Sequence, residues 1–222
     1  MDTYTSFLNY MIQEQKISRN ELMALSGNDQ NSFDPKTVTA EMQAWCTTLG
    51  ITQVTGRPLT LSPCPFSEEE LRLMHQKNEM LICIPKGLTL QEMANLFRLE
   101  SWAVKDPLVV SRKEKEDLWL KTSASPTPAF MGITGIEMKQ LAEKNNWVLF
   151  SLLYYMAFIA RFCYLFQKKP DYRYWIWLPK GRYDRSGMLI AGFDGNDHFN
   201  VHGWMPHFSA SFLGARYLEA KN

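Results

Sequence analysis

The sequence lacks the short motifs that mark well-known chemistries. Its 222 residues contain no G-x-x-x-x-G-K-[ST] phosphate loop, no G-x-G-x-x-G turn and no G-x-S-x-G elbow. In the first two motifs, the glycines let backbone N–H groups approach a phosphate. In the third, the glycines allow the sharp turn that exposes the nucleophilic serine. Without them the sequence indicates no specific reaction, and we expect no cofactor and lean toward a protein that is not an enzyme.

An excess of positive charge is also missing. The chain has 24 Lys and Arg against 23 Asp and Glu, a net charge of +1. Nucleic-acid binders usually carry a basic excess that attracts phosphates. Residues 18–27 and 34–49 have the outline of a helix-turn-helix, but the second segment contains one Lys and no Arg. Such a segment makes a poor recognition helix, so we expect no nucleic-acid partner.

The four cysteines form no recognisable framework. Cys46, Cys64, Cys83 and Cys163 lie 18, 19 and 80 residues apart, with no C-x-x-C pair. This pattern is typical of reduced, buried thiols in a cytoplasmic protein. The N-terminus lacks a basic stretch followed by an apolar run, so we expect no signal peptide. A hydrolase that pairs Cys83 or Cys163 with a distant histidine stays open, because such partners meet only in the folded chain.

No apolar run is long enough to suggest a membrane span. The longest lies at residues 147–166, and only 14 residues precede its single charge, Arg161. A spanning helix needs roughly 20 apolar residues, and a charge inside a bilayer is costly. We therefore predict a central helix buried in protein and expect no membrane partner.

Helix starts are frequent in the first part of the chain. A capping box, Ser or Thr followed three residues later by Glu, satisfies two backbone N–H groups at once. Asp34-Pro35 marks a further start, with Gly50 as the natural stop of that helix. The boxes are Ser18/Glu21, Ser67/Glu70, Thr89/Glu92, Ser111/Glu114 and Thr134/Glu137.

The pattern changes after Pro170 to short aromatic segments separated by turns. Four strands are predicted, at residues 172–178, 188–193, 198–204 and 208–217, and their short connections favour an antiparallel meander. Before them we expect one short strand at 80–84, an extended stretch at 51–61 and a long loop at 121–135.

The predicted fold class is therefore α+β. Helices occupy the N-terminal three quarters, a long buried helix lies near 147–166, and a C-terminal antiparallel β meander of about four strands follows. Two regions are predicted, 1–125 and 126–222, which could form one continuous domain.

The last fifty residues also hold most of the candidate functional side chains. In a strand at 198–204, the two-residue period places His198, Asn200, His202 and Trp204 on one face. Aromatic rings supply contact area, and amides and imidazoles supply hydrogen bonds, as in ligand-contact surfaces. We predict a binding surface made of these four residues together with Trp175, Trp177 and Arg182.

A metal site in the same segment is the alternative prediction. Its ligands would be Asp197, His198, His202 and His207, in a metal-assisted hydrolase. Histidines four residues apart on a strand are about 13 Å apart, so a bulge or a returning loop would be needed to join them. The predicted function is thus a non-catalytic binding or assembly module with an unknown protein or small-molecule ligand, and the oligomeric state is left open.

Overall fold

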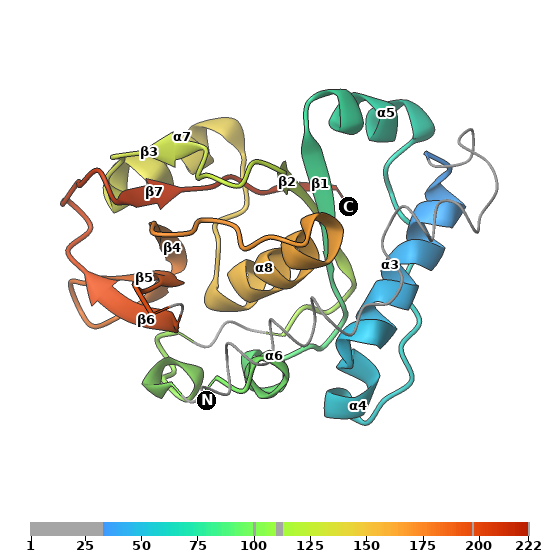
Figure 1. Cartoon of the computed structure of the whole chain (residues 1–222), viewed down its shortest axis with the longest axis horizontal. Coiled ribbons are helices and arrows are strands. Elements are labelled where there is room, and N and C mark those ends of the chain that lie inside the picture. Colours follow the sequence, from blue (N-terminus) through green and yellow to red (C-terminus); the bar gives the residue numbers. More distant parts are fainter. Residues whose placement is uncertain (1–32, 100, 110–112, 197, 222) are drawn as a thin grey trace.

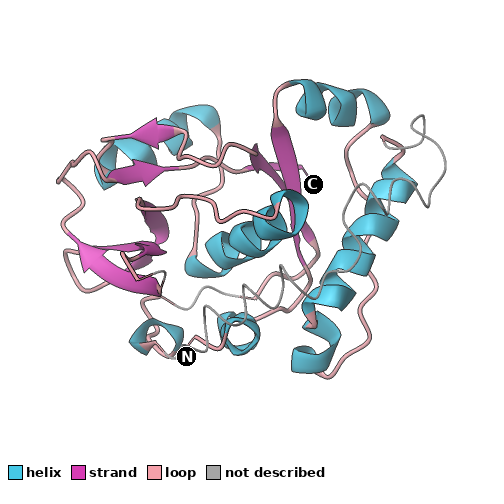
Figure 2. Ribbon diagram, viewed as in Figure 1, coloured by secondary structure: helices cyan, strands magenta, loops and turns pink. Residues whose placement is uncertain are grey.

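The computed structural model describes residues 33–99, 101–109, 113–196 and 198–221, and within them it contains six α-helices and eight strands (Figures 1 and 2). The helices are α3 (Pro35–Leu49), α4 (Ile51–Thr55), α5 (Glu68–Gln76), α6 (Leu90–Phe97), α7 (Gly135–Asn145) and α8 (Leu152–Phe166). The strands are β1 (Glu79–Ile84), β2 (Leu118–Ser123), β3 (Phe130–Met131), β4 (Trp175–Arg182), β5 (Met188–Phe193), β6 (Phe199–Trp204), β7 (Leu213–Ala215) and β8 (Glu219–Lys221).

The chain is α+β, but the predicted division into a helical front and a β tail is wrong. Strands β1 to β3 all precede residue 132 and are interspersed among the helices of the first three quarters of the chain. The Ser111/Glu114 box misled the prediction: Ser111 lies outside the described residues, and residues 113–117 contain no helix. The chain enters β2 instead, because that segment is held between β1 and β8, two partners distant in sequence.

The local signals for helix starts gave better predictions than the division of the chain. The boxes of α5, α6 and α7 each form both reciprocal hydrogen bonds. Helix α3 begins as predicted, with an Asp34 carboxylate oxygen accepting from the Thr37 N–H at 3.1 Å, and it ends at Gly50 with φ 91°. The predicted extended stretch at 51–61 is wrong in its first part, which forms α4. The Ser18/Glu21 box lies outside the described residues.

The larger sheet has the strand order β3-β7-β4-β5-β6. Strands β4, β5 and β6 follow one another in antiparallel pairs, as the short turns predict. The fourth predicted strand does not extend this meander, because β7 pairs with the opposite side of β4 and runs parallel to it. Strand β6 is consequently at the end of the sheet.

The smaller sheet joins two strands from residues 79–123 to the C-terminal strand β8. Its order is β1-β2-β8, and both pairs are antiparallel. The C-terminal β8 therefore completes a sheet that the first 123 residues begin. A single buried cluster also runs from Met42 to Leu218. The division into regions 1–125 and 126–222 stays a prediction.

Helix α8 lies in the middle of the molecule, between the two sheets (Figure 1). The Ser151 hydroxyl caps it by accepting from the Tyr154 N–H at 3.2 Å, and it starts five residues later than the apolar run that predicts it. Every residue from Leu152 to Tyr164 is buried. This is expected of a helix that is apolar on all sides. Among the described residues, no helix is long and apolar enough to cross a membrane.

The two faces of the larger sheet are covered by different helices. One face, including Leu178 and Leu189, belongs to the same buried cluster as α8. The other face forms a second, smaller cluster in which Trp177 and Ile190 pack with Met138 of α7. Strand β6 is one of the two edge strands of this sheet in the described residues, and β3 is the other.

Candidate functional site

Three of the predicted contact residues lie together on the α7 side of the sheet. The register places Asn200 beside Gly192 and Gly192 beside Trp175, while His202 lies beside Ile190. The rings of Trp175 and His202 approach to 5.2 Å between centroids. His202 is exposed, and Trp175 and Asn200 are half-buried. These three side chains form one small polar and aromatic area.

Two other predicted residues do not join them. Trp177 is fully buried, and its indole N–H donates to the Ile133 carbonyl oxygen at 2.9 Å, so its role is in packing. Arg182 is exposed at the far end of β4, where its guanidinium donates to the Arg185 carbonyl oxygen. Neither side chain is placed to share a ligand with His202.

His198 takes part in the turn before β6. Its Nδ1 lies 3.5 Å from the Asp194 carboxylate, which also accepts from the His198 N–H at 3.0 Å and from the Asn200 amide at 2.9 Å. Partial burial opposes ionisation of Asp194, but these donors outweigh it and lower the pKa of the carboxyl. Asp194 therefore organises the entry into β6.

Three residues of the alternative metal site, His198, His202 and His207, lie among the described residues. Among the residues that the structure describes, no set of three or more His, Cys, Asp and Glu side chains could hold a metal ion. His207 is exposed in the loop after β6, and Asp197 lies outside the described residues. The metal hypothesis stays a prediction.

The end of β6 borders an apolar depression of about 350 Å³. Its large side chains are each 39–48% exposed: Tyr183, Trp204, Met205 and Phe208. The rings of Trp204 and Phe208 are 6.0 Å apart, and Trp102 adds a further exposed ring 5.2 Å from Tyr183. This group of exposed apolar side chains makes the depression a candidate interaction site.

The outer edge of β6, beside this depression, pairs with no other strand among the described residues. At the start of the hairpin the Asp194 N–H donates to the His198 carbonyl oxygen at 2.9 Å. The two-residue period of an antiparallel pair then directs the peptide groups of Asn200 and His202 toward β5, and those of Val201 and Gly203 away from it. No described residue hydrogen-bonds to these outward groups of Val201 and Gly203.

No family model, curated protein or solved structure matches the chain. Its function must therefore be argued from the geometry of the described residues alone.

The sequence prediction did not include Met205 and Phe208, because it grouped residues by strand faces and both lie in the connection between β6 and β7. The segment 204–208 (WMPHF) is itself unusually apolar for a loop, and that was the signal available. Arg161 was not predicted as a site residue, because its charge was considered only as evidence against a membrane span. A lone charge in a buried helix needs a partner, and this was the signal that could have identified it.

Proposed function

We propose that this protein is a non-catalytic binding module that takes up an extended segment of a partner protein along β6. The observation that carries the proposal is that the outer edge of β6 pairs with no described strand and lies next to the apolar depression. Backbone groups of Val201 and Gly203 would bond to the incoming strand, and an apolar side chain of the partner would enter the depression. Such strand addition takes affinity from main-chain hydrogen bonds and specificity from side-chain pockets.

The composition of β6 supports this proposal. Natural edge strands are usually protected against pairing by Lys, Pro, a bulge or very short length. Strand β6 is six residues long, reads FNVHGW, and pairs with β5 without a register shift. It therefore carries none of these protections. Asn200 and His202 point to the α7 side, where they would hydrogen-bond to polar side chains of the added strand.

We place this function in the cytoplasm. All four cysteines are free and buried, which suits a reducing compartment. A partner for β6 would then be another cytoplasmic protein with an extended segment.

Selection from a random peptide library on the immobilised protein tests the proposal. We expect the selected peptides to share an apolar residue and to lose at least about tenfold in affinity for the Phe208→Ser variant. The matched control is Phe212→Ser, because Phe212 is similarly exposed, 43% against 48%, but does not line the depression. Equal losses for the two variants would contradict the proposed position of the site.

N-methylation of a selected peptide tests the mode of binding. A methyl group on a backbone nitrogen removes one donor, and an added strand directs alternate nitrogens toward its neighbour. We expect methylation to weaken binding strongly at every second position and weakly at those between. A uniform response along the peptide would rule out strand addition while leaving an ordinary surface contact.

Elemental analysis separates this proposal from the metal-assisted hydrolase. The purified protein should contain no transition metal near one ion per chain. A stoichiometric metal that disappears in the combined His198→Ala and His202→Ala variant would favour the hydrolase.

A further inference from the structure

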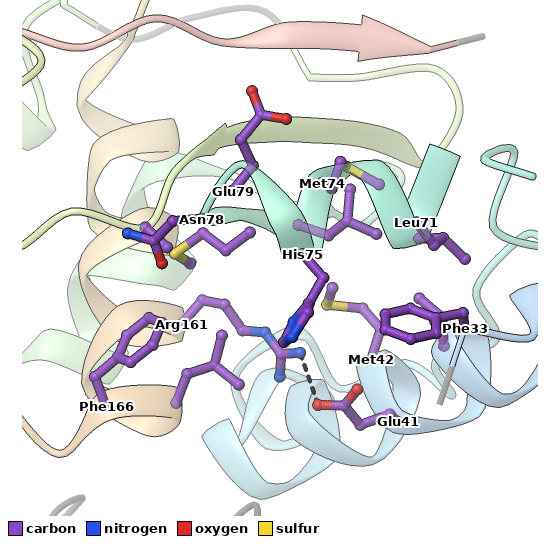
Figure 3. A pocket seen from close by; sticks show the side chains of 15 residues that line it. Phe33, Glu41, Met42, Leu71, Met74, His75, Asn78, Glu79, Arg161 and Phe166 are labelled. Atoms are coloured by element: carbon purple, nitrogen blue, oxygen red, sulfur yellow. Dashed lines mark hydrogen bonds and ion pairs between the residues drawn. The ribbon is translucent and has the colours of Figure 1, made fainter. Parts of the chain in front are cut away.

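A second concave site lies between α3, α5 and α8, on the other side of α8 from β6 (Figure 1). Figure 3 shows it from close by. Its volume is about 180 Å³, roughly the share of six liquid water molecules. Ten of its fifteen described lining residues are apolar, among them Phe33, Leu71, Met74, Met80, Leu165 and Phe166. Arg161 is the one Lys or Arg residue among its described lining residues.

Arg161 is buried with only part of its hydrogen-bonding capacity used. Its side chain is 6% exposed, and its Nη2 donates to a Glu41 carboxylate oxygen at 2.8 Å. The Nε and Nη1 atoms are buried and have no hydrogen-bond partner among the described residues. The guanidinium carbon lies 5.3 Å from the Trp45 ring centroid and 5.4 Å from that of Tyr164. These rings stabilise the cation without satisfying its N–H groups.

The pocket holds few other polar groups. Besides Arg161 and Glu41, the polar residues His75 and Asn78 line it (Figure 3). The Glu79 side chain points away from them; its carboxylate accepts from the Tyr217 hydroxyl at 2.7 Å and lies 3.6 Å from the Lys121 ammonium. Among the described lining residues, Glu41 is therefore the one carboxylate paired with Arg161.

We propose that this pocket binds a small monocarboxylate with a short hydrocarbon chain. The carboxylate would accept from the unpaired donors of Arg161 after a rotation of the guanidinium, because Nε and Nη1 have almost no exposed surface in this conformation. A charge-assisted hydrogen bond is the strongest kind that a buried guanidinium can gain. The hydrocarbon chain would lie on the apolar wall. A dianion such as phosphate fits poorly, because Glu41 already neutralises part of the single Arg charge. An uncharged alkane would leave the Arg161 donors unsatisfied.

Isothermal titration of the full chain with sodium butyrate, hexanoate and octanoate tests the proposal, with 1-butanol and 1-hexanol as comparators of similar shape. We expect one binding site and a preference of at least about tenfold for a carboxylate over the matching alcohol. Alcohols that bind as tightly as the carboxylates would overturn it, as would the absence of any carboxylate binding at millimolar concentration.

Two substitutions in the pocket have opposite expected effects. Arg161→Met keeps the length of the side chain and removes its donors, so butyrate or hexanoate binding should fall by about tenfold or more. Glu41→Gln keeps a hydrogen-bond acceptor and removes the competing negative charge, so binding should strengthen several-fold. Arg98→Met is the control, because Arg98 is exposed and does not line the pocket.

A thermal melt of each variant shows whether it is folded. If Arg161→Met fails to fold, the Glu41→Gln titration still tests the proposal, because a purely structural ion pair would show no gain of carboxylate affinity when its acid is neutralised. Unchanged or weaker binding by folded Glu41→Gln overturns the proposal.

Discussion

Arg216 and Asp171 form an ion pair whose two side chains are both completely buried. The guanidinium donates to both carboxylate oxygens, at 2.6 to 3.0 Å. The carboxylate also accepts from the Tyr155 hydroxyl at 3.1 Å, and Arg216 donates to the Ser125 carbonyl oxygen at 2.8 Å. The pair thereby links β7, the loop after β2 and the central helix α8.

Removing one member of this pair should strongly destabilise the fold. We expect Arg216→Met to lower the free energy of unfolding by about 3–5 kcal/mol, because it leaves a buried carboxylate without its counter-ion. Urea denaturation measures the loss. The control is Glu68→Gln, which breaks the exposed pair with Arg72 and should change stability by less than about 1 kcal/mol. Similar losses in the two variants would contradict the structural role given to Arg216.

Acid should weaken the contact between α5 and β8. The Lys221 ammonium, and then the Ser67 N–H, hold the pKa of Glu70 at about 2, below its ordinary value of 4.5. A lowered pKa means that Glu70 stabilises the folded state fully above about pH 4.5, and that this contribution is lost as the pH falls toward 2. The stability difference between the wild type and Glu70→Gln should therefore shrink across that interval.

Urea denaturation between pH 7 and pH 2.5 checks this expectation. Glu69→Gln is the matched control in the same helical turn, because Glu69 is exposed and has no ion pair among the described residues. A constant difference between the wild type and Glu70→Gln over the whole range would disprove the assigned effect of Glu70.

The cysteines should be inert in the folded protein. Burial raises the pKa of Cys46 and of Cys163 to about 12, and it raises those of Cys83 and Cys64 as well. Only the thiolate reacts rapidly with alkylating agents. Iodoacetamide at pH 8 should therefore modify the native chain slowly, with Cys64 first because it is the most exposed of the four.

Mass spectrometry after timed labelling measures the order, and labelling in 8 M urea is the control that should modify all four. Rapid native labelling of Cys83 or Cys163 would instead revive the hypothesis of a Cys–His hydrolase.

How far the sequence predicts this fold depends on how local each interaction is. Ser67 and Glu70 meet within one turn, and Asp34 caps α3 from the adjacent position, so both could be read from spacing. The alternation of β5 and β6 is also local, since a short turn joins them. The pairing of β2 with β8 brings Leu120 beside Ala220, and no pattern in either segment indicates it.

The candidate sites likewise combine local features, which the sequence predicts, with tertiary contacts, which it does not. Asn200 and His202 share a face because of strand period, which the sequence carries. The depression needs Tyr183 from one connection and Phe208 from another, and the second pocket needs Glu41 of α3 beside Arg161 of α8. These pairs are made by tertiary packing between segments that contain no signal for each other.

Gly203 allows the backbone of β6 to approach Tyr183 closely. A Cβ at position 203 would lie 1.8 Å from Tyr183 Cγ and 2.3 Å from its Cβ, so rotation of the ring alone could not relieve the clash. Gly203→Ala should therefore displace the 183–187 connection and lower the free energy of unfolding by about 1–3 kcal/mol. Gly195→Ala, in the preceding turn, meets nothing within 4 Å and should change it by less than about 0.5 kcal/mol.

The same pair of variants bears on the proposed binding site. Tyr183 forms one wall of the depression, so Gly203→Ala should weaken peptides selected on the wild type, while Gly195→Ala should not. Urea denaturation and peptide titration together separate the two effects. Peptide affinity that survives a large loss of stability in Gly203→Ala would show that the Tyr183 wall does not contact the partner, and the contact would then have to lie on the Trp204 and Phe208 side.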